Sequence, residues 1–218
     1  MTITDDHLHQ GMRRKLVTEL ERKGITNRSV LEAIGKLPRH AFIDDSAFLR
    51  FAYADIPFPI GHGQTISQPY TVAFQTALLD VHKGEKVLEI GTGCGYQTAV
   101  LCELGARVRS IERVKPLHQR TRDRLRAMGY KAELAFGDGF KGAQVFAPFD
   151  KILVTCGAPA IPSALVEQMK EGGRMVIPIG AGEVQTMVTI DKLPGGSLRQ
   201  ADHGAFRFVP MLKDRVEG

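Results

Sequence analysis

The chain has 218 residues, 43% of them hydrophobic and 24% charged, which supplies enough apolar material for a buried core and excludes a disordered protein. No apolar run approaches the roughly 18 residues of a membrane-spanning helix, and the opening MTITDDHLHQ has no signal-peptide core, so we expect no membrane partner and no export. The formal net charge is +5, which would suit a nucleic-acid partner only if the basic residues formed a continuous stripe.

The first part of the chain is predicted to be mainly helical. Within residues 5–24, apolar residues recur at every fourth position, which is typical of an amphipathic helix. They are Leu8, Met12, Leu16 and Leu20. A second helix is predicted from the capping residue Asn27 to the residue before Pro38. Residues 38–68 are rich in aromatics, proline and glycine and predict irregular structure, and a third helix is expected to begin at Pro69.

From Lys86 onward, short apolar runs alternate with helical segments. Strands are predicted at 86–90, 107–112, 131–136, 150–156, 174–179 and 186–193, and helices at 96–104, 115–128 and 162–169. This alternation predicts an α/β fold: a doubly wound, mostly parallel, Rossmann-like sheet with helices on both faces and an N-terminal helical extension. We expect a single domain over 1–218, with a helical part at 1–80 and an α/β core at 81–218.

The basic residues concentrate in the predicted helix at 115–128. Four of them fall at every second position, namely Arg120, Arg122, Arg124 and Arg126. On a helix this spacing spreads them around the outside, and no aromatic residue lies between them to stack on bases. We interpret the segment as a solvated helix face and expect no nucleic-acid partner.

The strongest local motif is VLEIGTGCGY, a buried strand followed by Gly91, Gly93 and Gly95. Glycines let a backbone turn sharply and approach a ligand closely. Glu89 lies near the end of this strand, and Glu112 lies at the end of the next, where such folds bind ribose hydroxyls. The motif therefore predicts a nucleotide-like ligand at the carboxyl ends of adjacent strands.

Two features favour S-adenosyl-L-methionine over a dinucleotide. A dinucleotide site needs a third glycine at position 96, where this chain has Tyr96. An acid at the position of Glu89 would repel a pyrophosphate but suits a ligand with a cationic sulfonium and an ammonium group. Asp138, in the GDG turn after the third strand, could accept a hydrogen bond from an adenine amino group, although a plain turn accounts for it equally well.

Three further stretches narrow the assignment. They are GHGQTISQPYTVA at 61–73, PFDKILVTCGAPAIPSALVEQMKEGGRMVIPIG at 148–180 and FRFVPM at 206–211. Together with the glycine motif they resemble the protein-L-isoaspartate O-methyltransferase family of class I S-adenosylmethionine-dependent methyltransferases, over about residues 16–211. FRFVPM resembles the closing strand of that family. The resemblance implies a repair enzyme that methylates the free carboxylate of L-isoaspartyl residues in damaged proteins and peptides.

The resemblance also implies site residues. Ser67 fills the position of the active-site serine, although a serine next to Pro69 could simply cap a helix. The positions that match cofactor-binding residues are Thr65, Ile66, Glu89, Gly91, Gly93, Glu112, Asp138 and Gly139. Two positions depart from the family pattern: Leu212 replaces a more common threonine, and Cys94 replaces a small serine or alanine.

Two other functions are compatible with the glycine motif alone. The chain could methylate a different acceptor, or it could bind the cofactor without catalysis. The complete GQTISQPY segment with Ser67 favours isoaspartyl repair. Cys94, Cys102 and Cys156 show neither metal-ligand spacing nor a disulfide pattern, so we expect no metal and a reducing, cytoplasmic location. We expect the protein to act as a monomer.

Overall fold

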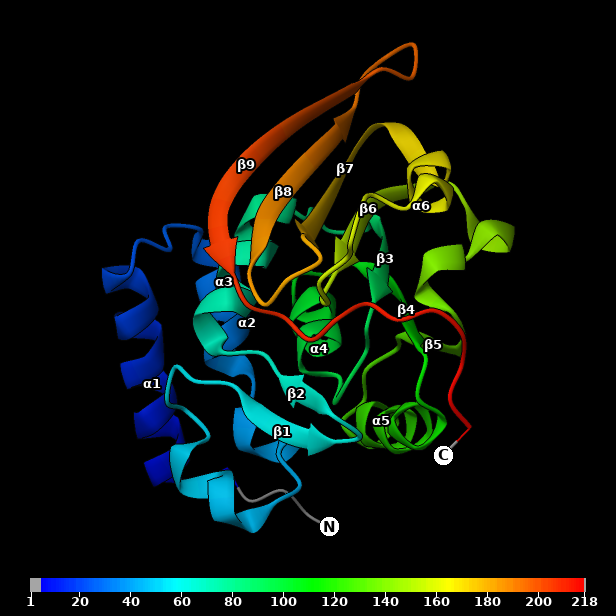
Figure 1. The fold of residues 1–218 in the computed structure, drawn as a ribbon. Helices are drawn as coiled ribbons and strands as arrows, with labels where there is room; N and C mark the ends of the chain where they lie inside the picture. The colour runs from blue at the N-terminus through cyan, green and yellow to red at the C-terminus, as the bar shows by residue number, and fades with distance from the viewer. Residues whose placement is uncertain (1–4, 218) are drawn as a thin grey trace.

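A seven-stranded sheet forms the centre of the computed structural model, which describes residues 5–217 (Figure 1). Residues 1–4 and 218, which include the start of the MTITDDHLHQ segment and both ends of the predicted domain, lie outside the described residues. The strands are β3 (Lys86–Ile90), β4 (Arg107–Glu112), β5 (Glu133–Phe136), β6 (Phe149–Val154), β7 (Met169–Ile179), β8 (Gln185–Lys192) and β9 (Leu198–Phe206). Their order across the sheet is β5-β4-β3-β6-β7-β8-β9.

The first five strands in this order are parallel, and β8 and β9 add an antiparallel edge. The chain winds from β3 outward to β4 and β5, then returns to the other side of β3 as β6. The loops after β3 and β6 therefore leave in opposite directions and open a crevice at their carboxyl ends, where doubly wound folds bind ligands. The predicted doubly wound, mostly parallel sheet is confirmed.

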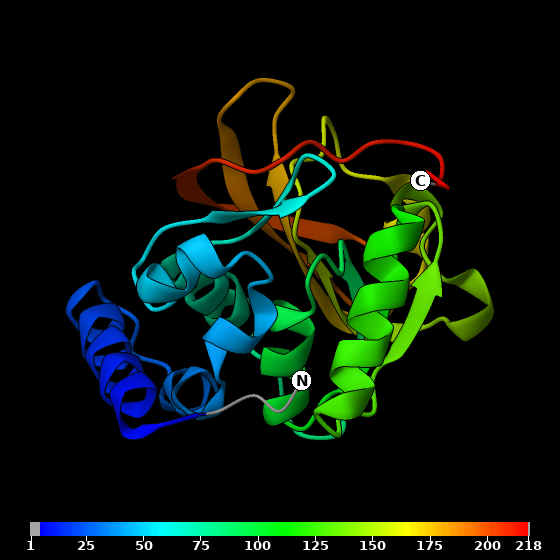
Figure 2. The same cartoon turned by 90° about the horizontal axis from the view of Figure 1, so that it is seen from below.

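Helices cover both faces of the sheet (Figures 1 and 2). The first face carries α3 (Pro69–Leu79), α4 (Tyr96–Glu103) and α5 (Lys115–Ala127), and α6 (Ser163–Glu167) packs in the core of the opposite face. Outside α3 and α4 lie α1 (His7–Arg22) and α2 (Arg28–Lys36). Asp6 caps α1 through the backbone N–H of His9, and Asn27 caps α2, as predicted.

One apolar cluster joins the N-terminal helices to the α/β core. Leu16, Leu20 and Ile34 belong to the same buried cluster as Tyr96 and Val100 of α4. Burying large apolar side chains stabilises each by about 1.5–3 kcal/mol relative to exposure, so this shared cluster ties the helical part firmly to the sheet. The packing supports the prediction that the two parts form one domain.

The segment 38–68 is more ordered than expected. It contains two short 3-10 helices, η1 (Arg39–Phe42) and η2 (Ser46–Phe51), and a hairpin of β1 (Phe58–Gly61) and β2 (Gln64–Ile66). All three residues at the hairpin tip have positive φ: Gly61 at 88°, His62 at 55° and Gly63 at 68°. Short strands of this kind carry little periodic signal, so the sequence indicated only turns there.

Toward the C-terminus, two predictions were wrong in detail and one strand was missed. The helix expected at 162–169 ends at Glu167, because the chain enters β7 at Met169, where it pairs with Phe149. The strand β9 was missed because most of its side chains are exposed and polar, leaving no apolar alternation to detect. FRFVPM is not a strand beyond Phe206. Residues 207–217 instead form a tail that pairs through isolated bridges with the loops after β6 and β4, Pro210 with Gly157 and Val216 with Val114.

Two further findings concern residues 5–217 alone. No helix in that range combines the length and apolar composition that a bilayer crossing requires. Within the same range, no group of three or more histidine, cysteine, aspartate or glutamate side chains is arranged to hold a metal ion.

Candidate active site

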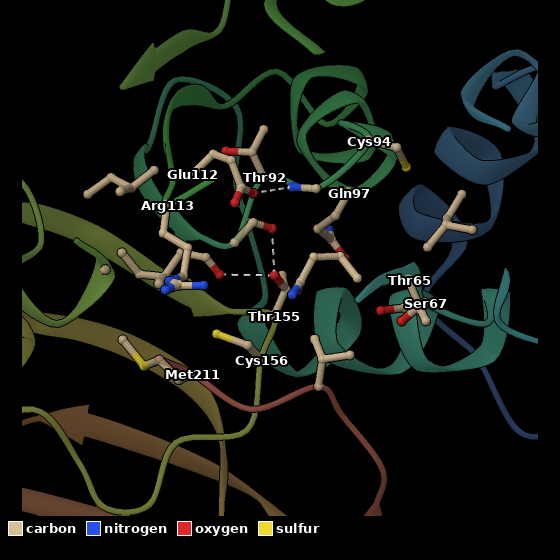
Figure 3. Close-up of a pocket in the computed structure, with 18 of the residues that line it drawn as sticks. Thr65, Ser67, Thr92, Cys94, Gln97, Glu112, Arg113, Thr155, Cys156 and Met211 are labelled. Carbon is tan, nitrogen blue, oxygen red and sulfur yellow. Dashed lines mark hydrogen bonds between the residues drawn. The ribbon is translucent and has the colours of Figure 1, made fainter. Parts of the chain in front are cut away.

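A pocket lies at the carboxyl ends of β3, β4 and β6, at the switch point of the sheet (Figure 3). Its volume is about 820 Å³ when the open mouth is included. The glycine loop after β3, the end of the β1–β2 hairpin and the C-terminal tail all contribute to its wall. Figures 1 and 2 both show the hairpin and the tail lying side by side over this edge of the sheet.

Side chains from three elements fix the glycine loop. The Glu112 carboxylate at the end of β4 accepts a hydrogen bond from the Gly93 N–H at 2.8 Å. Thr121 of α5 donates to the Gly93 carbonyl at 2.6 Å, and Thr155 after β6 donates to the Gly91 carbonyl at 2.7 Å. The loop is therefore held in shape by the protein itself, which reduces the entropy that a ligand must remove on binding.

The glycines are required where the backbone forms the pocket wall. Gly91 has φ of 97°, and a Cβ added there would lie 2.5 Å from Oγ1 of Thr155. A Cβ on Gly139, after β5, would lie 2.4 Å from Cγ2 of Ile90. Both contacts are closer than real Cβ atoms approach, so any side chain at either position would displace the wall.

Glu112 lines the pocket with its carboxylate almost fully buried, at 4% exposure. Besides Gly93, it accepts a hydrogen bond from the backbone N–H of Val114 at 2.9 Å. Burial raises the pKa of Glu112, and the N–H groups of Val114 and Gly93 oppose that increase by stabilising the anion. Each carboxylate oxygen has room for a second donor, so Glu112 can also receive hydroxyl groups of a ligand.

Glu89 lies beneath the pocket and is not part of its wall. Its side chain is completely buried, and Thr98 of α4 donates a hydrogen bond to it at 2.5 Å. Burial raises the pKa of Glu89 to about 7. The carboxyl group faces Thr98 of α4 in the structure, so the expected direct contact between Glu89 and a ligand stays a prediction. Its position supports a structural role under the glycine loop.

Asp138 lies next to the pocket without lining it. Its carboxylate accepts hydrogen bonds from the backbone N–H groups of Phe140 at 2.9 Å and Asp214 at 3.3 Å, and it borders a neighbouring cavity beside Arg215. Its neighbour Gly139 does line the pocket. The expected contact between Asp138 and an adenine amino group is not made by the pocket wall as it stands and stays a prediction.

Ser67 lies where the pocket meets a second cavity. Four residues line both spaces, namely Thr65, Ser67, Thr155 and Val209. The second cavity is also bordered by Gln68, Thr71 and Arg207. Figure 3 shows Thr65 and Ser67 on one side of the pocket and Glu112 on the other. The arrangement places Ser67 at the junction between the pocket and this second cavity, which we call the vestibule.

Ser67 does not cap a helix. The N-cap of α3 is Gln68, which makes no side-chain capping bond, and the Asp55 carboxylate accepts the backbone N–H of Tyr70 at 2.6 Å instead. The capping interpretation of Ser67 is therefore wrong, because Asp55, fifteen positions before Tyr70, performs that function. His62 is exposed at the hairpin tip and lines neither cavity.

The C-terminal tail closes one side of the pocket. The Arg113 guanidinium donates to the carbonyls of Lys213 and Asp214, and the Met211 N–H donates to the Gly157 carbonyl at 2.8 Å. Met211 and Leu212 line the pocket as a result. Sequence reasoning did not identify Arg113 or Thr155; both directly follow strand ends, the one signal that could have indicated them.

Two arginines that the sequence assigned to a solvated helix face instead hold backbone segments around the pocket. Arg120 donates to the Ile60 carbonyl of the hairpin at 2.7 Å, and Arg124 donates to the Cys94 carbonyl of the glycine loop at 3.2 Å. Both also pair with Asp44. Because they lie four residues apart, they share one face of α5, which the alternating spacing in the sequence had obscured.

The two thiols in the pocket wall are poor nucleophiles. Burial raises the pKa of Cys94, and burial raises the pKa of Cys156 to about 12, so both remain protonated near neutral pH. Both cysteines line the pocket, where they act as small residues of its wall. Their raised pKa values give no support for covalent catalysis by a thiolate.

Comparison with known proteins agrees with this geometry. The family model described as "Protein-L-isoaspartate(D-aspartate) O-methyltransferase (PCMT)" matches residues 11–216. A protein-L-isoaspartate O-methyltransferase of Christiangramia forsetii is 54% identical over 97% of this chain and 99% of its own length. The enzyme of the same name from Flavobacterium psychrophilum is 55% identical with the same coverage.

Solved structures show the same fold. A solved protein-L-isoaspartate O-methyltransferase that is 29% identical superposes with a TM-score of 0.82, covering 91% of this chain and 65% of that chain. A Plasmodium falciparum structure in complex with S-adenosyl-L-homocysteine, 23% identical, has a TM-score of 0.81 and covers 93% and 99% of the two chains. With the full-length match to the family model, these findings show that the chain belongs to the protein-L-isoaspartate(D-aspartate) O-methyltransferase family.

Proposed function

We propose that this protein transfers the methyl group of S-adenosyl-L-methionine to the free carboxylate of L-isoaspartyl residues in damaged proteins and peptides. The observation that carries the proposal is the pair of cavities that meet at Ser67. A transfer reaction needs a donor and an acceptor side by side, and the pocket and the vestibule share a wall at this residue. Full-length similarity to enzymes of this name supports the assignment.

The residues of the pocket at the glycine loop fit the donor. Glu112 offers buried carboxylate oxygens for ribose hydroxyls, and the glycine loop offers a wall without side chains at Gly91 and Gly93. Of the other predicted cofactor-binding residues, Thr65, Ile66 and Gly139 also line this pocket. S-adenosyl-L-methionine supplies an electrophilic methyl group on a cationic sulfonium when it is bound.

The acceptor needs no general base. A carboxylate has a pKa of about 3.9 and is already ionised at neutral pH, so its oxygen can attack directly. We assign Ser67 to donating a hydrogen bond that orients this carboxylate. The negative charge of the carboxylate and the positive charge of the sulfonium both disappear as the ester forms. Because water stabilises the separated charges, excluding water from the junction while the two groups are aligned favours the transfer. Val209 and Thr155 lie in the shared wall, where they limit access of water.

The direct test is a methyl-transfer assay with an isoaspartyl peptide and its normal aspartyl twin of the same sequence. We expect transfer to the isoaspartyl peptide alone, with release of the label as methanol under mild alkali, because a carboxyl methyl ester hydrolyses there and an N-methyl group does not. Equal transfer to both peptides, or alkali-stable label, would reassign the protein to a different acceptor. Binding of S-adenosylhomocysteine without any transfer would indicate a cofactor-binding protein.

Three broader expectations belong to the same proposal. The cysteines at 94, 102 and 156 are free thiols, which suits a reducing compartment such as the cytoplasm. A monomeric state and the absence of nucleic-acid binding remain predictions. Light scattering and a salt-dependent DNA-binding assay would test them.

A further inference from the structure

A buried arginine without an acidic partner lies directly behind Ser67. The Arg39 side chain, at the start of η1, is 0% exposed and is the largest fully buried side chain among the described residues. Its Nη2 donates to the carbonyl of Ser67 at 2.8 Å. Neither Nε nor Nη1 has a hydrogen-bond partner within residues 5–217, and no carboxylate there lies within ion-pair distance.

Such an arrangement is costly to maintain. Arginine stays protonated even in an apolar environment, so Arg39 keeps a full positive charge inside the protein. A buried charge is normally paired, because transfer out of water without compensation is strongly unfavourable. Two contacts offset part of this cost: the ring of Tyr96, whose centroid lies 4.7 Å from the guanidinium carbon, and a through-space attraction to Asp55, which is beyond ion-pair distance.

These contacts connect the two halves of the site. Ser67 belongs to the acceptor junction, and Tyr96 begins α4 directly after the glycine loop and lines the donor pocket. The rigid, planar guanidinium of Arg39 thus contacts one residue of the acceptor junction and one residue of the donor pocket. Arg39 is therefore in a position to fix the distance between Ser67 and the donor pocket. It also places a positive charge behind the point where an anionic acceptor must dock.

We propose that Arg39 is a positioning residue for the methyl acceptor: it holds Ser67 through its carbonyl, and its unpaired charge attracts the acceptor carboxylate into the junction. The inference rests on the methyl transfer proposed above. It explains why a cation without an ion-pair partner is placed at this point of the core, since the substrate carboxylate itself supplies that negative charge across a medium of low dielectric constant.

The test compares Arg39→Met, Arg39→Gln and Arg39→Lys in steady-state transfer to an isoaspartyl peptide. We expect Arg39→Met to raise the peptide KM at least about tenfold, while the Kd for S-adenosylhomocysteine stays within about threefold. Arg39→Lys, which keeps the charge, should restore much of the peptide KM, whereas the neutral Arg39→Gln should not. Should Arg39→Met fail to fold, the Lys and Gln pair still separates charge from packing.

Arg13→Met is the matched control. Arg13 is also a buried arginine of the N-terminal layer, at 8% exposure, but it pairs with Asp5 at 2.9 Å and makes no contact with Ser67. Its loss should lower the melting temperature without changing the peptide KM. If Arg13→Met and Arg39→Met alter KM equally, Arg39 serves stability alone and the inference fails.

A double-mutant comparison adds a readout that a purely structural role would not give. If Arg39 acts partly through the Ser67 hydroxyl, Arg39→Met should cost less in the Ser67→Ala background than in the wild type. Full additivity of the two effects on kcat/KM, with no rescue by lysine, would overturn the proposal. Absence of transfer by the wild type would instead refute the proposed function and is distinguishable from both outcomes.

Discussion

Replacing Glu112 by glutamine tests how the pocket combines ligand binding with loop architecture. The Glu112 carboxylate accepts one backbone N–H on each oxygen, from Gly93 at 2.8 Å and from Val114 at 2.9 Å. Glutamine has almost the same shape but offers only one acceptor oxygen. Its amide NH₂ must face one of these two N–H groups, so a buried donor loses its partner.

The expected changes in stability and in ligand affinity follow from the number of hydrogen bonds that are lost. One unsatisfied buried N–H costs about 1–3 kcal/mol, which should appear as a lower free energy of unfolding. The remaining hydrogen bonds lose their charge assistance, which roughly halves their strength, and a ligand hydroxyl held by the anion loses about 1 kcal/mol or more. With the displaced glycine loop, we expect the Kd for S-adenosylhomocysteine to rise at least about tenfold.

Titration calorimetry and urea unfolding measure the two effects separately. Glu85→Gln is the matched control, because Glu85 also accepts a backbone N–H, from His82 at 2.7 Å, but lies at the opposite end of β3. It should lose stability without losing ligand affinity. A folded Glu112→Gln protein with wild-type Kd would show that this carboxylate does not hold the ligand, and the assignment of the donor pocket would have to be revised.

Three other changes test separate parts of the structure. Ser67→Ala should keep the Kd for S-adenosylhomocysteine and slow single-turnover transfer about ten- to a thousandfold, and an unchanged rate would remove Ser67 from the mechanism. Glu89 has a pKa raised to about 7, so the folded state keeps its proton while the unfolded state ionises near 4.5. Its contribution to stability is therefore fully present below about pH 4.5 and lost as pH rises toward 7, by at most about 3 kcal/mol. Urea unfolding across this range should show that slope in the wild type and a smaller one in Glu89→Gln; identical slopes would contradict the raised pKa. Gly91→Ala should destabilise the fold more than Gly84→Ala, because both positions have positive φ but only a Cβ at Gly91 would collide with Thr155. Equal melting temperatures for the two alanine variants would show that this collision is relieved at no cost.

Much of the fold could be predicted from the sequence because it depends on interactions between residues that are close together in the chain. The cap at Asn27, the helix start at Pro69, the alternation of apolar runs with helical segments and the glycine motif all depend on residues close together in sequence. Composition and spacing therefore sufficed to predict them. The same short-range signals predicted Gly91, Gly93 and Glu112 at strand ends, and the parallel sheet brings those ends together.

Tertiary structure alone decided what each polar side chain faces. Glu89 is in register with Ser110, two residues before Glu112, so both carboxyl groups point to the same face of the sheet. The packing of α4 covers Glu89, whereas Glu112, at the very end of β4, reaches the pocket. Ser67 is released from capping α3 because Asp55 occupies that role from across a loop. Arg39 meets Ser67 and Tyr96 although it is 28 and 57 positions away, contacts that no short-range pattern encodes because they exist only after the helical layer has packed on the sheet.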